Sequence, residues 1–183
     1  MSALDIQSNR SARKYSASVQ VMRVAWAFGR VLFRLVPRPL YGPRRVILRC
    51  FGAKVGRNVN IANTAAIYFP WNLEIGDWSS IGEHAYIYNL GLITIGEKST
   101  VSQRAHICAG THDYTDPALP LLTPPVKVGN QVWICADAFV GPNVEIGDGA
   151  VIGARAVVTK SINAWMVAAG NPARELKRRE MEG

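Results

Sequence analysis

Residues 128–158 read VGNQVWICADAFVGPNVEIGDGAVIGARAVV, and a branched aliphatic residue recurs at every sixth position of this stretch. The recurring residues are Val128, Ile134, Val140, Ile146, Ile152 and Val158. The same step of six continues upstream. Its upstream members are Val55, Ile61, Ile67, Ile75, Ile81, Ile87, Ile95, Val101 and Ile107. Six residues are too few for a strand with a return hairpin, so this spacing predicts a short strand followed by a turn of about 120°.

Three such steps close a triangle, and the register of the repeat slips after every third hexad. Two extra residues follow Ile67, two follow Ile87 and fifteen follow Ile107. A small or aliphatic residue usually stands two positions before the branched one, and residues i and i−2 share one face of a strand. We therefore predict an all-β prism of about five stacked parallel coils over residues 55–163, with an aliphatic interior. A β-sandwich is excluded because its strands would recur about every 8–12 residues.

Composition and charge indicate one folded domain with a basic N-terminal segment. Hydrophobic residues make up 49% of the 183 residues, and the formal net charge is +8. Residues 1–57 hold twelve Lys and Arg against one acid, whereas the rest holds nine against twelve. This asymmetry argues against a globally basic nucleic-acid binder. Three dispersed cysteines without CxxC spacing exclude a disulfide scaffold, and with no secretory signal visible they favour a cytoplasmic protein.

The basic segment predicts a mobile polar stretch over residues 1–18 and a basic amphipathic helical segment over 19–54. Within it, Val21–Val36 is too short and too charged to span a membrane. Its arginines share one narrow sector, and the apolar side chains fill the opposite side. That apolar side is formed by Val21, Val24, Ala25, Phe28, Val31, Leu32 and Leu35.

Two interpretations of this helix stay open. In the first, its apolar side packs on the rest of the protein or on a partner subunit. In the second, it docks peripherally on the inner face of an anionic membrane, through residues 19–49. Basic side chains would help that docking, namely Arg38, Arg44, Arg45 and Arg49.

Five longer motifs add a family resemblance that covers residues 50–180. They are PWNLEIGDWSSIGE, IYNLGLITIG, SQRAHICAGTHDYTDP, VWICADAFVGPNVEIGDGAVIGARAVVTK and AAGNPARELKRR. Together they resemble the hexapeptide-repeat acetyltransferases of the colanic-acid-biosynthesis type, related to the maltose, galactoside and nodulation O-acetyltransferases. The resemblance implies a left-handed parallel β-helix and a homotrimer with sites between neighbouring prisms. It also implies acetyl-CoA as co-substrate without a metal, and a sugar hydroxyl or lipid-linked glycan acceptor in cell-surface glycan biosynthesis. Residues 164–183 are expected to form a C-terminal tail with a short helix.

The long interruption, residues 111–127, carries the expected base. Transfer of an acetyl group to a hydroxyl needs a general base, and His112 aligns with the histidine that has this role in the family. Asp113 could orient the imidazole or form a turn; many relatives have proline at that position. Asn89 matches a polar position that faces the acceptor in relatives, and it could equally be a turn residue.

The donor side is also assigned from the resemblance. Trp133 matches a tryptophan near the acetyl-CoA site, and Ala136 matches a position whose N–H contacts the thioester carbonyl. Gly153 and Ala154 are small enough to admit a pantetheine arm. Basic and turn residues that follow the last coils are expected near the CoA phosphates, namely Lys160, Pro172 and Arg174.

Two rival functions use the same fold. A γ-type carbonic anhydrase needs three histidines on one zinc ion, but His106 and His112 are six residues apart and would lie on adjacent prism faces, with His84 at a corner. A non-catalytic scaffold or partner-binding β-helix would not need the His112 loop together with Trp133. We therefore favour the acetyltransferase.

Overall fold

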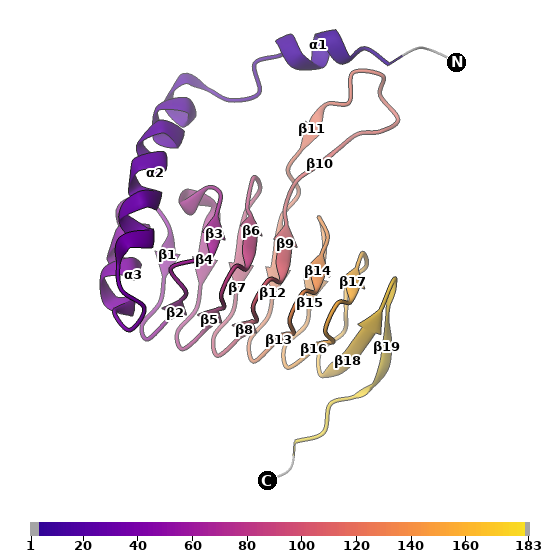
Figure 1. The fold of residues 1–183 in the computed structure, drawn as a ribbon. Coiled ribbons are helices and arrows are strands. Elements are labelled where there is room, and N and C mark those ends of the chain that lie inside the picture. Colours follow the sequence, from indigo (N-terminus) through magenta and orange to yellow (C-terminus); the bar gives the residue numbers. More distant parts are fainter. Residues whose placement is uncertain (1–3, 182–183) are drawn as a thin grey trace.

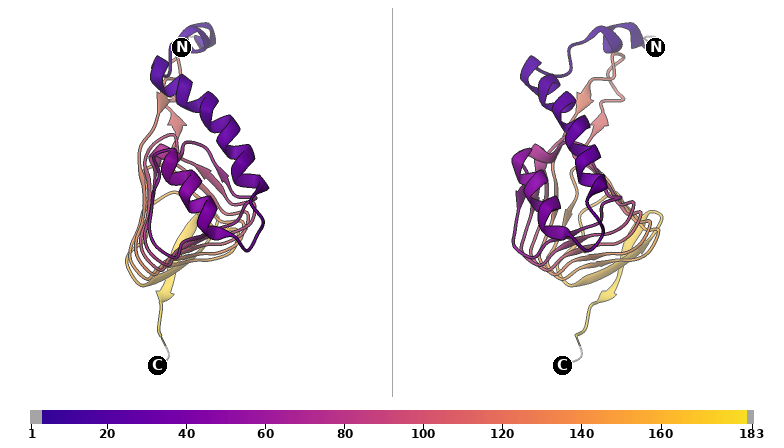
Figure 2. Two further views of the ribbon diagram at one scale, coloured as in Figure 1. Left: turned by 90° about the vertical axis from the view of Figure 1, so that its left-hand side faces the viewer. Right: turned by 60° about the vertical axis from the view of Figure 1, so that its left-hand side comes forward.

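The computed structural model describes residues 4–181 as a parallel β-helix with a helical cap at its N-terminal end (Figure 1). Residues 1–3 and 182–183, parts of the predicted N-terminal stretch and C-terminal tail, lie outside the described residues. Figure 2 looks along the prism and shows its triangular outline behind the cap. Each coil runs through three sheets in turn, which we call A, B and C.

Sheet A contains β1 (Lys54–Val55), β4 (Leu73–Ile75), β7 (Ile93–Ile95), β12 (Val126–Val128) and β15 (Glu145–Ile146). Sheet B contains β2 (Asn60–Ile61), β5 (Ser80–Ile81), β8 (Thr100–Val101), β13 (Trp133–Ile134), β16 (Val151–Ile152), β18 (Met166–Gly170) and β19 (Ala173–Arg178). Sheet C contains β3 (Ala66–Ile67), β6 (Tyr86–Tyr88), β9 (His106–Cys108), β14 (Phe139–Val140) and β17 (Val157–Val158). Outside these sheets, β10 (Thr111–His112) and β11 (Leu121–Leu122) form an antiparallel pair, and η1 (Pro70–Asn72) is a 3-10 turn.

The hexad prediction is confirmed. Strands one coil apart pair in parallel with the aliphatic residues in register, as in Ile81 with Val101. Ile134 is 0% exposed and Val132, two residues earlier, is 1% exposed, so both inward positions form the core. The coils stack so closely that a Cβ at Gly96 would lie 2.6 Å from the carbonyl of Gly129. Five coils contain a strand of every sheet, and Ile162 and β18 begin a sixth turn, which gives about six turns.

The predicted C-terminal helix is wrong. Residues 166–178 form the hairpin of β18 and β19, and β18 pairs in parallel with β16. The run of charged residues at Ala173–Arg178 has good helix propensity, but sheet B ends in an open edge that the hairpin extends. Tertiary pairing therefore overrides local propensity here.

The N-terminal cap consists of α1 (Ile6–Ser11), α2 (Ala17–Leu35) and α3 (Tyr41–Cys50). Ser16 caps α2 by accepting a hydrogen bond from the Val19 N–H, and the helix ends before Pro37, as predicted. α2 packs on the prism through a narrow stripe of Trp26, Gly29 and Phe33. A Cβ at Gly29 would lie 2.4 Å from the Phe51 ring, so glycine is needed for this close approach.

The broad apolar side of α2 does not pack on the rest of the described chain. Its large side chains are 56–72% exposed: Val21, Val24, Phe28, Val31, Leu32 and Leu35. The intramolecular form of the packing interpretation is therefore wrong. The helix docks with the stripe that lies between its arginine sector and its apolar side.

The basic residues of the cap complete the hydrogen bonding of the first coil. N–H groups of each coil donate to carbonyls of the next coil, as from Asn60 to Ser79 at 2.9 Å. The carbonyls of coil one therefore face the open end of the prism and have no preceding coil. The cap supplies the donors. The pairs are Arg49 Nε to Val55 O (2.9 Å), Arg45 Nη1 to Val59 O (2.9 Å), Arg44 Nε to Ile61 O (2.8 Å) and Trp26 Nε1 to Ile67 O (3.0 Å).

This capping changes the interpretation of three arginines. From the sequence, Arg44, Arg45 and Arg49 are expected to help docking on a membrane, but their guanidinium groups are bound to the backbone of coil one. Arg44 is 0% exposed and also donates to carbonyls of the segment that joins α2 to α3. An uncapped strand edge is both unsatisfied and prone to pair with other chains, so the cap protects the fold.

Candidate active site

The fifteen-residue interruption forms a hairpin arm that leaves the prism between sheets C and A (Figure 1). We call the three edges of the prism the AB, BC and CA edges, after the sheets they join. The arm occupies residues 111–125, up to the start of β12, and lies on the CA edge. Thr111 pairs with Leu122 and His112 pairs with Leu121. Side chains at the base of such an arm are held by backbone pairing on both strands, which suits a group that must be positioned.

His112 is exposed, and its ring is held by one backbone hydrogen bond. Its Nδ1 lies 2.7 Å from the Leu119 carbonyl oxygen. A carbonyl oxygen can only accept, so Nδ1 carries the proton, and in the neutral imidazole the lone pair is then on Nε2. Leu119 has a φ of 46°, in the left-handed region, and this turn directs its carbonyl back toward the imidazole.

Asp113 contacts Thr115 rather than His112. Its Oδ1 accepts from the Thr115 N–H at 2.9 Å and from the Thr115 hydroxyl at 2.6 Å. These hydrogen bonds lower the pKa of Asp113, so the carboxylate stays ionised and closes the turn. Of the two roles that the sequence leaves open for Asp113, the structure places it as a turn former. The partner of His112 is the Leu119 carbonyl, which the sequence analysis missed.

Asn89 lies inside the coil. It is 0% exposed, and its Oδ1 accepts from the N–H groups of Tyr68 and Phe69, at 3.0 and 2.9 Å. Its side chain thus fixes the short excursion at Phe69, which leads into η1. Contact between Asn89 and an acceptor stays a prediction, whereas its role in positioning this backbone is visible.

The small residues that are predicted to contact acetyl-CoA lie along the BC edge. Ala136 lies between β13 and β14, and Gly153 and Ala154 lie between β16 and β17, one coil further on. Within residues 4–181 the N–H of Ala136 donates to no acceptor, so it is available to an oxyanion. A Cβ at Gly153 would lie 2.9 Å from Ala169 Cβ, so glycine at this position permits the close stacking of the last coils. Contact between the BC edge and an acyl carrier stays a prediction.

The other predicted donor residues divide between two edges. Trp133 is 48% exposed on sheet B beside Ala136, and its Nε1 donates to Ser102 Oγ at 3.0 Å. The turn between β18 and β19 extends the BC edge by one turn and carries Pro172, with Arg174 exposed beside it. Lys160 follows β17 and lies on the CA edge, the same edge as His112. Thus one chain holds the candidate base on a different edge from all the predicted donor residues except Lys160.

An ion pair on the BC edge was not predicted. Arg104 Nε and Nη2 donate to the two carboxylate oxygens of Asp137, at 2.7 and 2.9 Å. Both residues have a φ near 60° and occupy equivalent turn positions of adjacent coils. That equivalence is readable from the hexads, so the pair could have been found by aligning coils three and four.

The three histidines lie on separate elements. His106 lies on sheet C between Tyr86 and Phe139, with ring centroids at 4.9 and 5.2 Å, and burial lowers its pKa. His84 is exposed on the BC edge, and His112 lies in the arm. Among residues 4–181, no group of three His, Cys, Asp or Glu side chains lies close enough together to hold a metal ion.

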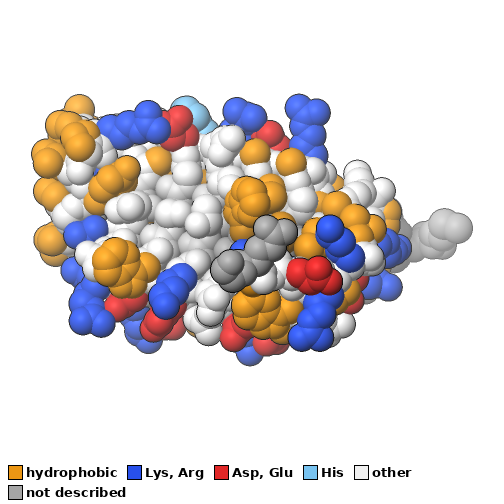
Figure 3. Space-filling model, turned by 90° about the horizontal axis from the view of Figure 1, so that it is seen from below, with side chains coloured by type: hydrophobic (Ala, Val, Ile, Leu, Met, Phe, Trp, Pro, Cys, Tyr) orange, Lys and Arg blue, Asp and Glu red, His pale blue; other side chains and the backbone are white. Residues whose placement is uncertain are grey.

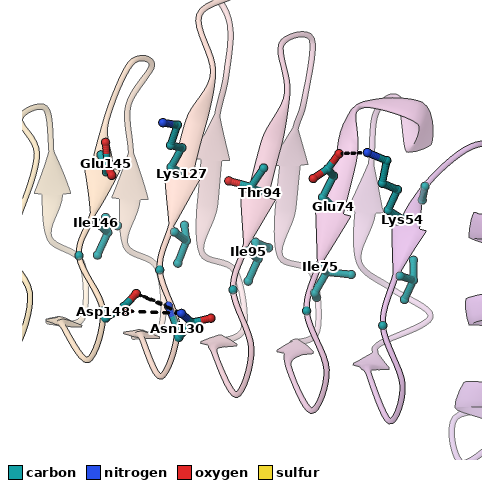
Figure 4. Close-up of a pocket in the computed structure, with 18 of the residues that line it drawn as sticks. Lys54, Glu74, Ile75, Thr94, Ile95, Lys127, Asn130, Glu145, Ile146 and Asp148 are labelled. Atoms are coloured by element: carbon teal, nitrogen blue, oxygen red, sulfur yellow. Dashed lines mark hydrogen bonds and ion pairs between the residues drawn. The ribbon is translucent and has the colours of Figure 1, made fainter.

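The surface has a groove on sheet A and a cavity beside the arm. A groove of about 960 Å³ runs along the outer face of sheet A, where Figure 4 shows the outward row with its Lys54–Glu74 ion pair (2.6 Å). No histidine lines that groove. A second cavity of about 660 Å³ lies between the arm, η1 and the segment joining α1 to α2. Its lining combines aromatic rings with amides and one cation: Tyr15, Phe69, Trp71, Asn9, Asn72 and Lys14.

Comparison with known proteins agrees with this architecture. The family described as "Bacterial transferase hexapeptide (six repeats)" matches residues 125–160. A protein of Escherichia coli K12 that carries the name colanic acid biosynthesis acetyltransferase is 42% identical over 154 residues, which are 84% of this chain and 85% of that protein.

Two solved structures share the fold. A maltose O-acetyltransferase from Clostridium difficile is 27% identical with a TM-score of 0.81, covering 99% of this chain and 100% of that one. A hexapeptide-repeat acetyltransferase from Vibrio cholerae, complexed with acetyl coenzyme A, is 20% identical with a TM-score of 0.83, covering 92% and 93%; at that identity it shows the fold alone. On the identity to the E. coli protein and on the repeat itself, the chain belongs to the hexapeptide-repeat acetyltransferases and is an acyltransferase that uses acetyl-CoA.

Proposed function

We propose that this enzyme transfers the acetyl group of acetyl-CoA to a sugar hydroxyl in the biosynthesis of a cell-surface glycan, with His112 as the general base. The observation that carries this proposal is the hydrogen bond from His112 Nδ1 to the Leu119 carbonyl. In the neutral imidazole this hydrogen bond selects the tautomer with its lone pair on Nε2, and His112 is exposed on the arm, which is the state that a base for a hydroxyl requires.

The reaction would proceed by direct transfer. Nε2 of His112 takes the hydroxyl proton as the acceptor oxygen forms its bond to the thioester carbon. The N–H of Ala136 would stabilise the negative charge on the carbonyl oxygen, an effect of about 3–4 kcal/mol for one well-placed donor. The carbon–sulfur bond then breaks, and the leaving thiolate recovers the proton from the imidazolium. Trp133, Gly153 and Ala154 would line the carrier, with Lys160 and Arg174 near its phosphates.

The division of residues between edges supports a homotrimer. His112 and Lys160 lie on the CA edge, and Ala136 and Ala154 lie on the BC edge of the same chain. A cyclic arrangement that sets the CA edge of one copy against the BC edge of the next brings both sets together. Three triangular prisms around one axis provide three such contacts, each heterologous and closed.

The cavity of about 660 Å³ is the acceptor site that we favour. Aromatic rings such as Trp71 and Tyr15 can cover the apolar face of a sugar, and the amide of Asn72 can bond its hydroxyls. Lys14 would suit a phosphate of a nucleotide-linked or lipid-linked sugar. The pocket borders the arm at Ala118, Pro120 and Leu121.

We further propose that the apolar side of α2 rests on an anionic membrane surface. No helix of the described residues 4–181 is long and apolar enough to cross a membrane. Figure 3 shows hydrophobic side chains gathered at the α2 end of the molecule, with Lys and Arg beside them. Arg30 and Arg34 are exposed in the opposite sector of the same helix, and Arg38 follows the helix and pairs with Glu83. Phe28→Ser with Leu32→Ser should reduce flotation with anionic vesicles, and unchanged flotation would contradict the proposal.

The test of the enzymatic proposal is a thiol-release assay with an acceptor screen that includes nucleotide sugars, amino sugars and lipid-linked oligosaccharides. His112→Ala should lower kcat by orders of magnitude and leave acetyl-CoA binding, measured by calorimetry, unchanged. Tyr114→Ala is the matched control, because Tyr114 lies on the same arm and is 87% exposed. Wild-type turnover in His112→Ala would contradict the proposal, and absence of acetyl-CoA binding in the wild type would favour the scaffold alternative.

A further inference from the structure

The segment expected to be a mobile polar N-terminus contains a helix, α1, that lies over the end of the arm (Figure 1). Three hydrogen bonds join them. The Asp5 N–H donates to the Pro117 carbonyl at 2.8 Å, and Asn9 Nδ2 donates to the carbonyls of Ala118 and Leu119, both at 2.6 Å. All three acceptors belong to the turn at the end of the arm.

The Asn9 amide is held at both ends. Lys14 Nζ donates to Asn9 Oδ1 at 2.8 Å, while Nδ2 faces the two carbonyls. A reversed amide would place its oxygen against two carbonyl oxygens and its NH₂ against an ammonium group. Only one orientation therefore satisfies the contacts, and in this orientation Asn9 is a donor to the arm.

The Leu119 carbonyl is the point where α1 and the candidate base meet. It accepts from Asn9 Nδ2 at 2.6 Å and lies 2.7 Å from His112 Nδ1. A carbonyl oxygen has two lone pairs, so these two donors use its full capacity and fix its direction. Leu119 holds a φ of 46°, which is unfavourable for a residue with a side chain by about 1 kcal/mol or more. A turn with this cost needs external contacts to persist, and Asn9 supplies them.

We propose that Asn9 is a positioning residue for His112. By holding the Leu119 carbonyl in place, it keeps the imidazole in the Nδ1–H form, with Nε2 directed toward the acceptor. α1 is then a strap that couples the N-terminal segment to the catalytic arm, 103 residues away in sequence. This inference rests on the proposed role of His112. Asn9 itself touches none of the reacting atoms in this role.

The test compares Asn9→Ala and Asn9→Asp with Gln7→Ala in the full-length enzyme. The aspartate keeps the size of asparagine but cannot donate, and Gln7 is an exposed residue of the same helix whose side chain makes no hydrogen bond within residues 4–181. Because Asn9 also lines the proposed acceptor pocket, the main readout is the slow hydrolysis of acetyl-CoA without any acceptor. This reaction needs the base but no sugar.

We expect both Asn9 variants to lower kcat for transfer and for hydrolysis by about 10- to 100-fold, with the KM for acetyl-CoA unchanged. Gln7→Ala should match the wild type. ¹⁵N NMR of His112 should show the Nε2–H tautomer gaining population in the Asn9 variants, a change that a general loss of stability would not produce selectively.

Two outcomes separate the claims. If His112→Ala abolishes hydrolysis while Asn9→Ala hydrolyses acetyl-CoA at the wild-type rate with an unchanged tautomer, the strap inference is overturned and the proposed function stands. If His112→Ala retains hydrolysis and transfer, the proposed function fails first.

Discussion

Arg44 offers the sharpest energetic test of the cap. Its side chain is 0% exposed, and its guanidinium donates to four carbonyls, of which the Ile61 carbonyl belongs to the open end of coil one. The other three carbonyls lie in the connection after α2, at 2.7–3.1 Å, and are partly buried. Burial lowers the pKa of Arg44, yet within residues 4–181 no carboxylate pairs with it. The residue is therefore a charged donor satisfied by backbone alone.

Arg44→Met keeps most of the side-chain volume, so the cavity contribution is small and the loss is that of the hydrogen bonds. A hydrogen bond from a charged donor contributes about 1.5–3 kcal/mol net. The Ile61 carbonyl is enclosed, so the whole free energy of its hydrogen bond is lost, whereas the partly buried carbonyls form new hydrogen bonds with water. We expect the free energy of unfolding of the cap to fall by about 3 kcal/mol. Arg44→Lys should recover less than half of this, because one ammonium cannot reach four separated carbonyls.

The assay is hydrogen exchange with mass spectrometry, because in a repeat fold the loss will be concentrated at the cap. About 3 kcal/mol corresponds to roughly hundredfold faster exchange in α3 if opening is local. The control is Arg57→Met: Arg57 pairs with Asp77 at 2.9 Å on the surface, and such pairs contribute about 1 kcal/mol or less. Wild-type exchange in Arg44→Met would refute the capping argument. Full rescue by Arg44→Lys would show that charge alone is sufficient.

Three further outcomes follow from the site and the core. Burial lowers the pKa of His106, so below about pH 6.5 the unfolded state binds more protons than the folded state, and Tm should fall as the pH drops from about 6.5 to 5. His106→Phe should weaken this dependence, and an identical slope in the variant would contradict it. Ala154→Trp, at an exposed position of the BC edge, should raise the KM for acetyl-CoA at least about tenfold with Tm unchanged; an unaltered KM would place the carrier elsewhere. Asp113→Ala removes both bonds to Thr115 and should speed amide exchange in the arm by roughly tenfold while the coils stay protected, and equal exchange would deny Asp113 its turn role.

Most of the fold could be predicted from the hexads, because each coil repeats the same local pattern of inward and outward residues. Val132 and Ile134 are inward in the structure for the same reason that they stand two apart in the sequence. The C-terminal hairpin escaped prediction because residues 173–178 have helix propensity, and only the unpaired edge of sheet B selects a strand.

The packing of the N-terminal cap is a second feature that could not be predicted from the sequence. Arginine spacing on a helix identifies an amphipathic pattern but not which side packs, since Trp26, Gly29 and Phe33 form too narrow a stripe to stand out. Arg44 binds carbonyls whose lack of partners is a property of the first coil as a whole. No local pattern reports that property.

The candidate site, too, could be predicted from the sequence only in part. The arm and the small residues of the BC edge are visible as departures from the repeat. The Leu119 carbonyl is not, because a backbone oxygen has no side-chain identity and its direction depends on a φ of 46°. Asn9 meets this carbonyl only through tertiary structure, across more than a hundred residues of chain.

The central claim is that the base of one copy serves the donor edge of its neighbour. Mixing His112→Ala with Ala154→Trp, allowing copies to exchange, and assaying at an acetyl-CoA concentration well below the raised KM of Ala154→Trp tests it most directly. If the site lies between copies, random 1:1 reassembly regenerates about one quarter of the wild-type sites, with a matching recovery of turnover. If mixed assemblies form, as seen by native mass spectrometry, and turnover stays at the level of the separate variants, the site lies within one chain and the account is contradicted.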